Sequence, residues 1–237
     1  MPPTHLCSHF FMDPRNAPLK KRLKTALDRF ERHQGPKAWP GPSDPLNSLM
    51  QTLLSQNTND SLRDQAFQRL RERFETWGEV LAAPVGEVEE AIRIAGLSNQ
   101  KAQRMQTILK WVKQQFGRLS LSGLSEMDDE NALKLLTGQK GVGIKTAAVV
   151  LMASFGRDLC PVDTHVHRIS RKLGWVDDSA TAEKAFWLLK PNVPEGKGHS
   201  LHMNLLQFGR TICQARKPLC GECFMRDECV WEGKHNP

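Results

Sequence analysis

Apolar residues recur three or four positions apart along most of the chain, and this spacing predicts amphipathic helices rather than strands. No segment alternates apolar and polar residues convincingly, and no internal repeat or low-complexity tract is present. The sequence therefore predicts an all-α protein. The expected helices cover residues 20–33, 45–54, 62–74, 88–95, 98–116, 131–136, 144–155, 164–173, 181–189 and 200–208.

Local signals mark where several of these helices begin and end. Asp44 followed by Pro45 predicts an N-cap and a first helical residue, and Ser98 is the expected N-cap of the helix that Gly117 ends. The segment 144–155 is apolar on nearly every side, so we expect a central buried helix there. In the helix at 62–74, the predicted core positions are Leu62, Ala66, Leu70 and Phe74.

Two stretches lack apolar periodicity. Residues 1–18 contain four prolines, which predicts a mobile tail, although His5, Cys7 and His9 leave a metal site in this tail as an alternative. Residues 34–43 are rich in Pro and Gly and predict a linker.

The formal net charge of +7 and the pI near 9.2 favour an anionic polymer as partner. A solvated charged face is the alternative for the helix at 98–116, where the basic residues gather. The longest apolar run, 147–153, is too short to cross a bilayer, and the N-terminus lacks the apolar core of a secretory signal. We therefore expect no membrane association and a reducing, intracellular location. The basic residues between 98 and 118 are Lys101, Arg104, Lys110, Lys113 and Arg118.

One short segment combines features of an anion site with two groups that can do chemistry. Gly141 and Gly143 precede the expected helix at 144–155, and such glycines let backbone N–H groups approach a phosphate. Lys145 lies in the first turn of that helix, and Asp163 begins the next helix. A phosphate-binding lysine and a simple N-cap are the alternative interpretations of these two residues.

Four cysteines near the C-terminus form the pattern C-x6-C-x2-C-x5-C. A zinc site usually takes its cysteines from two closely spaced pairs, whereas only the middle pair is close here. The spacing therefore favours an iron–sulfur cluster, with structural zinc as the alternative. Cys160 and Cys7 are expected to be bystanders. The predicted cluster ligands are Cys213, Cys220, Cys223 and Cys229.

Together the segment 141–146, the segment 162–165 and the cysteines resemble the endonuclease III family of DNA glycosylases, from about residue 46 to residue 231. The resemblance implies a 4Fe–4S cluster, removal of oxidised or ring-saturated pyrimidines from duplex DNA, and backbone cleavage by β-elimination. It also implies that Lys145 is the nucleophile and Asp163 the catalytic carboxylate. In its two-domain arrangement, residues 44–156 form a six-helix barrel with the helix–hairpin–helix, and residues 19–43 and 157–237 form the cluster domain.

The resemblance and local chemistry also imply DNA contacts. Leu97 follows a helix-stopping glycine and is the expected wedge in the duplex, with ordinary core burial as the alternative. The family places a Gln opposite the orphaned base; that position corresponds to Asn57 here, with Gln56 beside it. A family glutamate is replaced by Thr137, and Lys140 adds a cation to the hairpin. The remaining expected DNA contacts are Gly141, Val142, Gly143, His165, Arg216 and Lys217.

The expected partner is therefore damaged double-stranded DNA, bound by a monomer in the cytoplasm or nucleoid. Three alternatives stay open at the level of sequence: a non-catalytic DNA-binding iron–sulfur protein, an electron-transfer protein, and a mismatch-specific glycosylase. Mismatch enzymes that remove adenine generally lack the lysine and carry a further C-terminal domain, whereas this chain contains Lys145 and ends eight residues after Cys229.

Overall fold

The structure is a computed structural model that describes residues 17–235, so most of the predicted tail, including His5, Cys7 and His9, lies outside the described residues. The described residues form eleven α-helices and short 3₁₀ turns, without any strand, which confirms the all-α prediction. The helices are α1 Leu19–Gln34, α2 Pro45–Leu54, α3 Asp60–Arg73, α4 Trp77–Ala82, α5 Val85–Ala91, α6 Ser98–Phe116, α7 Asp129–Thr137, α8 Ile144–Phe155, α9 Thr164–Lys172, α10 Ala182–Leu189 and α11 Gly198–Thr211.

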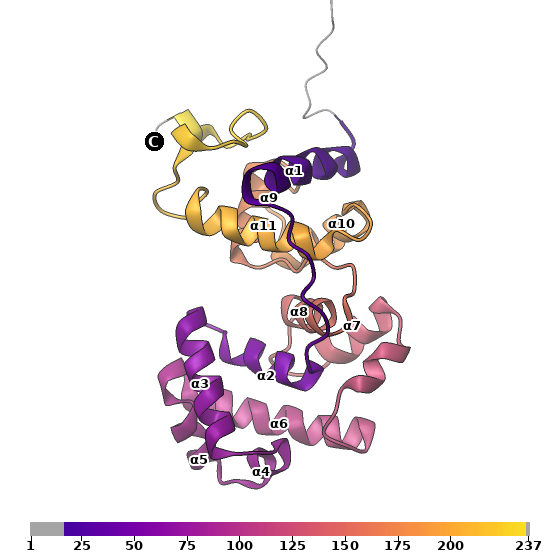
Figure 1. The fold of residues 1–237 in the computed structure, drawn as a ribbon, viewed down its shortest axis with the longest axis vertical. Coiled ribbons are helices and arrows are strands. Elements are labelled where there is room, and N and C mark those ends of the chain that lie inside the picture. Colours follow the sequence, from indigo (N-terminus) through magenta and orange to yellow (C-terminus); the bar gives the residue numbers. More distant parts are fainter. Residues whose placement is uncertain (1–16, 236–237) are drawn as a thin grey trace, which may run out of the picture.

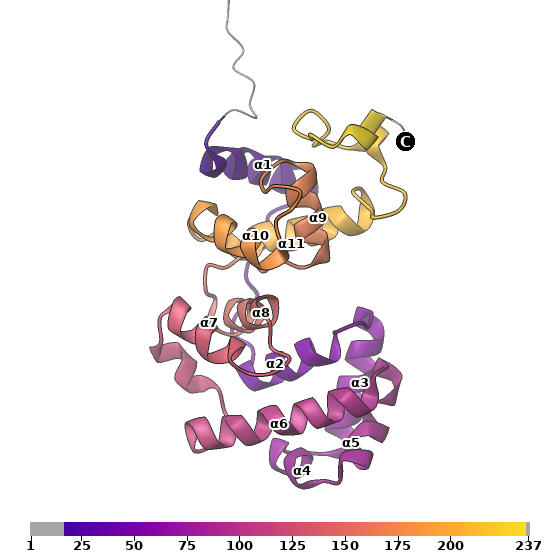
Figure 2. The same ribbon diagram turned by 180° about the vertical axis from the view of Figure 1, so that it is seen from behind.

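The helices lie in two groups (Figure 1). One group contains α2 to α8, and the other contains α1, α9, α10 and α11 with the C-terminal loop beyond them. The view from behind shows the same division (Figure 2). The chain passes between the groups twice, through residues 35–44 and 156–163. The predicted domain boundaries, before residue 44 and after residue 156, fall in these crossings; the division into two domains stays a prediction.

Helix α8 packs against α2, α7 and α10 and so contacts helices of both groups. Its side chains are buried on most sides; Ala147, Ala148, Val150 and Leu151 are wholly inaccessible. Burying apolar area contributes about 25 cal/mol per Å², so this helix is a main source of stability. The prediction of a central buried helix is confirmed.

Side chains cap six of the eleven helices of the described residues. In each case a side-chain oxygen accepts a hydrogen bond from the backbone N–H three residues later, which satisfies one of the free donors of the first turn. The predicted cap Asp44 is confirmed, at 2.7 Å from the N–H of Asn47. The caps of α2, α3, α4, α7, α9 and α10 are Asp44, Asn59, Thr76, Asp128, Asp163 and Thr181.

Two local predictions are wrong. Ser98 is the first helical residue of α6 rather than its N-cap, because Leu97 occupies the cap position in a left-handed conformation and the Ser98 hydroxyl bonds Glu89 at 3.3 Å. Leu62 is 37% exposed instead of buried, since only Ala66 and Leu70 of α3 face the core.

The segment after α3 contains a helix that apolar spacing did not reveal. Helix α4 is only six residues long, too short to show helical periodicity. Trp77 anchors it: the ring is buried and its indole N–H donates to Asn47 Oδ1 at 3.0 Å. The predicted helix at 88–95 is also divided, into α5 and a 3₁₀ turn at Arg93–Ala95 that ends at Gly96.

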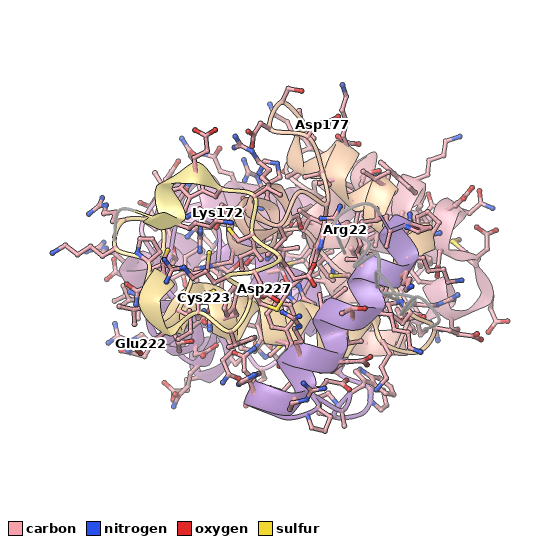
Figure 3. The ribbon with its side chains drawn as sticks, turned by 90° about the horizontal axis from the view of Figure 1, so that it is seen from above. Arg22, Lys172, Asp177, Glu222, Cys223 and Asp227 are labelled. Carbon is pink, nitrogen blue, oxygen red and sulfur yellow. The ribbon has the colours of Figure 1, made fainter. Side chains whose placement is uncertain are left out.

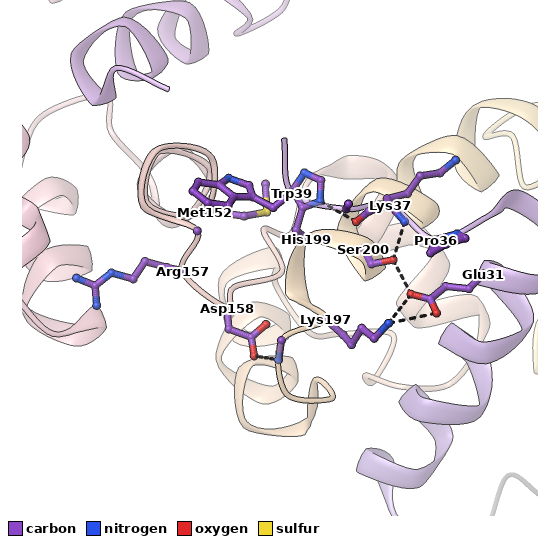
Figure 4. A pocket seen from close by; sticks show the side chains of 13 residues that line it. Glu31, Pro36, Lys37, Trp39, Met152, Arg157, Asp158, Lys197, His199 and Ser200 are labelled. Carbon is purple, nitrogen blue, oxygen red and sulfur yellow. Dashed lines mark hydrogen bonds and ion pairs between the residues drawn. The ribbon is translucent and has the colours of Figure 1, made fainter. Parts of the chain in front are cut away.

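The first crossing segment, residues 35–44, is bonded to helices of both groups (Figure 4). The indole of Trp39 donates to the carbonyl of Ala153 of α8 at 3.1 Å, and Ser200 of α11 links the N–H of Lys37 to the carboxylate of Glu31 of α1. A pocket is lined by residues of both crossing segments, and none of the predicted site residues lines it. Its position therefore does not identify the chemical site.

Helix α1 packs on the C-terminal loop (Figure 3). Phe30 is fully buried, with its ring 5.2 Å from Phe208 and 5.7 Å from Phe224. Arg29 contacts both carboxylate oxygens of Asp227, at 2.6 and 2.8 Å. The first helix thus fixes the loop that carries the cysteines.

Candidate active site and cluster-binding loop

The hairpin between α7 and α8 presents backbone donors at the start of α8. Gly141 has φ +90°, a conformation that favours glycine, and the N–H of Val142 closes the turn on the carbonyl of Gln139 at 2.9 Å. Gly143 is the N-cap of α8 and provides no capping side chain. The first-turn N–H groups of α8 are therefore available to an anionic ligand, as the sequence predicted.

Lys145 lies in this first turn, and its side chain is partly buried. Burial lowers the pKa of Lys145 below its ordinary value because a buried ammonium loses its hydration. The carboxylate of Asp163 acts in the opposite direction, and the guanidinium of Arg63 lowers the pKa further. The net direction favours the neutral amine, which is the nucleophilic form.

The cation that acts on Lys145 is not one of its neighbours in sequence. It is Arg63 of α3, rather than Lys140, Arg168 or Arg171 of the hairpin and α9. Arg168 instead donates to the carbonyls of Gly209 and Cys213, at 3.1 and 2.6 Å. Arg171 pairs with Asp178 at 3.1 Å. Arg63 was missed because α3 is distant in sequence and only the fold brings it near.

Asp163 has a clear structural role at the start of α9. Its Oδ1 accepts from the N–H of Val166 at 2.8 Å, which makes it the N-cap, so that alternative is confirmed. This contact fixes one oxygen, and the carboxylate remains close enough to Lys145 to influence its pKa. The two groups are therefore near each other, and their catalytic roles stay predictions.

Two further groups lie near the pair. His202 of α11 is buried, and burial lowers the pKa of His202 to about 4. The carboxylate of Asp163 opposes this shift, and the ammonium of Lys145 adds to it. Its Nδ1 lies 2.9 Å from the carbonyl of Pro161, which identifies Nδ1 as the protonated nitrogen of the neutral ring. Cys160 is buried as well, and burial raises its pKa, which leaves an inert thiol.

His202 was missed from the sequence, although a signal exists. It follows Leu201 and precedes Leu205, both fully buried, so a titratable residue adjoins an apolar helix face.

Thr137, which replaces a family glutamate, donates its hydroxyl to the carbonyl of Leu133 in its own helix at 2.8 Å.

The loop after α2 lies against the hairpin. The amide of Gln56 donates to the carbonyl of Gly141 at 3.1 Å, and its oxygen accepts from Arg104 at 2.7 Å. Asn57, by contrast, is exposed and has φ 54°. Leu97 is 54% exposed, so the alternative of an ordinary core leucine is wrong.

Other predicted DNA contacts have varied environments. Lys140 is exposed on the hairpin, and Arg216 and Lys217 are exposed on the loop between the first two cysteines. His165 is partly buried, and its ring lies 3.2 Å from Arg168.

Within the described chain, no helix is both long and apolar enough to cross a bilayer.

The four C-terminal cysteines line one cavity with Lys172, Arg226 and Trp231. Burial raises the pKa of Cys223 to about 11, and the other three thiols contribute in the same direction, which shows their mutual proximity. Buried thiols become thiolates when iron or zinc binds them. Among the described residues, no three His, Cys, Asp or Glu side chains are placed to hold a single metal ion.

The surroundings of this cavity hold the cysteine loop in place. The carbonyl of Cys213 accepts from Arg168, and the carbonyl of Cys229 accepts from Lys234. The N–H of Val230 donates to the carbonyl of Lys172 at 2.8 Å. The Lys172 ammonium lies 3.3 Å from the centre of the Trp231 ring. Helix α9, which Asp163 caps, therefore also supports the cluster-binding loop.

Comparison with known proteins decides the family. The model of HhH-GPD superfamily base excision DNA repair proteins matches residues 50–195, more than half of the chain. The chain belongs to this superfamily. A second model, the iron-sulfur binding domain of endonuclease III, matches residues 213–229, the segment that contains all four cysteines.

Relatives in the superfamily agree. Endonuclease III from Thermotoga maritima is 36% identical over 187 residues, which cover 79% of this chain and 83% of that protein. Endonuclease III from Sulfolobus acidocaldarius is 33% identical, covering 78% and 81%. A trapped endonuclease III–DNA covalent intermediate superposes with a TM-score of 0.77 at 27% identity, covering 91% of this chain and 97% of that one.

These findings confirm the resemblance drawn from the sequence. The protein is a base excision repair DNA glycosylase with AP lyase activity of the endonuclease III type, and it binds DNA. It carries a 4Fe–4S cluster, which the four cysteines of the cavity fit.

Proposed function

We propose that this glycosylase removes oxidised or ring-saturated pyrimidines from duplex DNA and cleaves the backbone through a Schiff base on Lys145. The observation that best supports this proposal is that Lys145, at the uncapped start of α8, lies near the carboxylate of Asp163. Burial lowers the pKa of Lys145. A duplex hides the sugar carbon C1′, so the enzyme must extrude the nucleotide before this amine can reach it.

In the proposed reaction the neutral amine of Lys145 attacks C1′. The bond from C1′ to the base breaks, and the base leaves with the bonding electrons and takes up a proton. Asp163 stabilises the positive charge that develops on the sugar and accepts a proton from the amine. The nitrogen lone pair then opens the sugar ring: the C1′–O4′ bond breaks, O4′ takes up a proton and the C1′=N imine forms. Loss of a proton from C2′ next breaks the C3′–O3′ bond, so the strand is cut by β-elimination with the 3′ phosphate as the leaving group.

The backbone clamp follows from the hairpin. The N–H groups at the start of α8 bind phosphate without sequence preference, and Lys140 adds a positive charge beside them. His165, Arg216 and Lys217 extend this contact along the backbone. The cysteines Cys213, Cys220, Cys223 and Cys229 hold the cluster, which gives the loop with Arg216 and Lys217 a fixed shape.

The wedge and the residue opposite the orphaned base are also part of the proposal. Leu97 is exposed at a turn and can enter the base stack. Gln56 already bonds Gly141 and Arg104, so we assign the space opposite the orphaned base to Asn57. We further propose that the enzyme acts as a monomer on DNA in the cytoplasm or nucleoid.

Borohydride trapping tests the proposed nucleophile. On duplex DNA with one oxidised pyrimidine, the native protein should give a covalent adduct because borohydride reduces the imine to a stable amine. Lys145→Ala should lose the adduct yet keep DNA binding, since the hairpin N–H groups remain. Lys134→Ala is the matched control, at an exposed lysine of α7 just before the hairpin, and it should leave trapping intact. Wild-type adduct yield from Lys145→Ala would refute the assignment.

A panel of lesions tests the substrate class. Oxidised pyrimidines, ring-saturated pyrimidines, oxidised purines and mismatched bases are each placed in the same duplex and assayed with and without alkali. We expect cleavage of the first two without alkali, because the lyase step breaks the strand itself. Preference for a mismatched base, or strand breaks that need alkali, would contradict the proposed substrate or the proposed lyase step respectively.

A further inference from the structure

Lys101 of α6 is a buried cation that the reaction itself does not use. Its side chain is only 3% exposed, and no carboxylate among the described residues pairs with it. The ammonium instead donates to three oxygens: the carbonyl of Leu54 at 2.8 Å, the hydroxyl of Thr58 at 2.7 Å and the carbonyl of Ala95 at 2.7 Å. An ammonium has three N–H donors, so each of them has one acceptor.

The three acceptors belong to the two chain segments that carry the proposed DNA-inserting residues. Leu54 and Thr58 flank the loop with Asn57, and Ala95 comes two residues before Leu97. The hydroxyl of Thr58 also donates to the carbonyl of Ala95, so the two segments touch directly at the ammonium. Burial lowers the pKa of Lys101, but three oxygen acceptors match only the protonated amine.

Backbone conformation singles out the same two segments. Asn57 with φ 54° and Leu97 with φ 49° are the only non-glycine residues of the described chain in the left-handed region. Such conformations are unfavourable for residues with a side chain and persist where surrounding contacts impose them. Each residue lies within two positions of a group bound by Lys101, which supplies those contacts.

We propose that Lys101 is a positioning residue that holds the Leu97 turn and the Asn57 loop at a fixed separation, so that both enter the duplex together. This inference rests on the proposed roles of Leu97 and Asn57. Without the ammonium, two buried carbonyls and a hydroxyl lose their shared donor, and the two segments lose their common anchor. The wedge and the filling side chain then move independently, which slows extrusion of the base.

Arg104, one turn further along α6, supports the same arrangement. It donates to Gln56, which in turn donates to the carbonyl of Gly141, so the Asn57 loop is connected to the hairpin as well. Residues three apart lie on one face of a helix. Helix α6 thereby aligns three DNA-facing elements through two cations, and the basic face expected from the sequence is in this part an internal support.

The test separates extrusion from chemistry. The variants are Lys101→Met, which keeps the stem and removes the donors, and Thr58→Val, which removes one acceptor at nearly constant volume. Lys110→Met, at an exposed lysine of the same helix, is the control. Single-turnover base removal is measured on one lesion in two settings: paired within a duplex, and unpaired in a bulge where the enzyme need not open the stack.

Lys101→Met should slow removal of the paired lesion by about tenfold or more, because loosened positioning is costly even far from the reacting atoms. The unpaired lesion should be affected about threefold or less on the same reasoning. Thr58→Val should show a smaller effect in the same direction, and Lys110→Met none. Equal losses on both substrates would indicate a purely structural role, and no loss on either would indicate no role; both results overturn the proposal.

Leu97→Ala is the reference for the wedge itself. If it slows only the paired substrate while Lys101→Met does not, the positioning proposal fails and the wedge stands. If Leu97→Ala has no selective effect, the wedge assignment and the positioning role both fail. Borohydride trapping on a preformed abasic site, which depends on Lys145, checks that the proposed chemistry is intact in each variant. Should Lys101→Met not fold, Thr58→Val decides by the same comparison.

Discussion

We predict that a methyl group added at Gly141 of the hairpin displaces Arg104 and breaks its hydrogen bond to Gln56. Gly141 has φ +90°, and a Cβ at this position would lie 2.3 Å from Nε of Arg104. Arg104 therefore has to move in Gly141→Ala, and its 2.7 Å bond to Gln56 is lost. The matched control is Gly143→Ala in the same hairpin, where nothing lies within 4 Å of an added Cβ.

The expected cost is a sum of two effects. A left-handed backbone costs a residue with a side chain about 1–2 kcal/mol. Loss of a hydrogen bond from a charged donor costs about 1.5–3 kcal/mol, and the lower end applies because Arg104 is only partly buried. Gly141→Ala should therefore destabilise the protein by about 3 kcal/mol. Gly143→Ala should cost about 1 kcal/mol, because alanine is a poorer N-cap than glycine.

Urea unfolding followed by far-UV circular dichroism measures this difference, with iron content matched between variants. Affinity for a duplex with an abasic analogue should fall for Gly141→Ala as well, because Gln56 no longer holds the hairpin in place. Unfolding of both alanine variants at the same urea concentration would contradict this prediction. A destabilised Gly141→Ala beside an unaffected Arg104→Met, which lacks the same bond, would contradict it as well.

Three further predictions follow from single features. Replacing Arg216 and Lys217 by Ala together should weaken binding to all duplex sequences alike and reduce the salt slope of log K by about 2, measured by fluorescence anisotropy. His202 is neutral when folded, with its pKa at about 4, but takes up a proton below pH 6.5 when unfolded, so stability should fall by about 3 kcal/mol between pH 6.5 and 4. His202→Gln should lack this part of the pH dependence in urea titrations. Phe30→Ala removes a fully buried ring and should cost about 3–5 kcal/mol in the same titrations, with loss of iron from the adjoining loop.

The sequence predicted the helices and the chemistry where local signals are strong. The bounds of α8 agree with the predicted range 144–155, because an apolar stretch between two glycines leaves little ambiguity. The cysteine spacing likewise predicted the cluster. Leu97 could be resolved only by the fold: its pattern allowed both core and wedge, and its 54% exposure excludes the core.

What the sequence did not predict depends on contacts between distant segments. Arg63 of α3 lowers the pKa of Lys145, and His202 of α11 lies near both Lys145 and Asp163. No local periodicity connects these helices to the hairpin. Lys101 was counted with a basic face because residues 98–118 contain five basic residues and no acidic one, yet its own side chain is buried. Helical spacing distinguishes faces but does not say which face meets a neighbouring helix.

Lys101 and Lys145 are two buried lysines whose different surroundings suit them to different proposed roles. Burial lowers the pKa of both, so desolvation alone does not distinguish a nucleophile from a structural cation. The difference lies in the acceptors: three oxygens surround the Lys101 ammonium and hold its protons in place. Lys145 instead lies near the carboxylates of Asp163 and Asp60, which raise its pKa, and the guanidinium of Arg63, which lowers it, at the uncapped start of α8. In the two proposals, the lysine with filled acceptors therefore positions the DNA-facing loops, and the lysine set among charges of both signs carries the reaction.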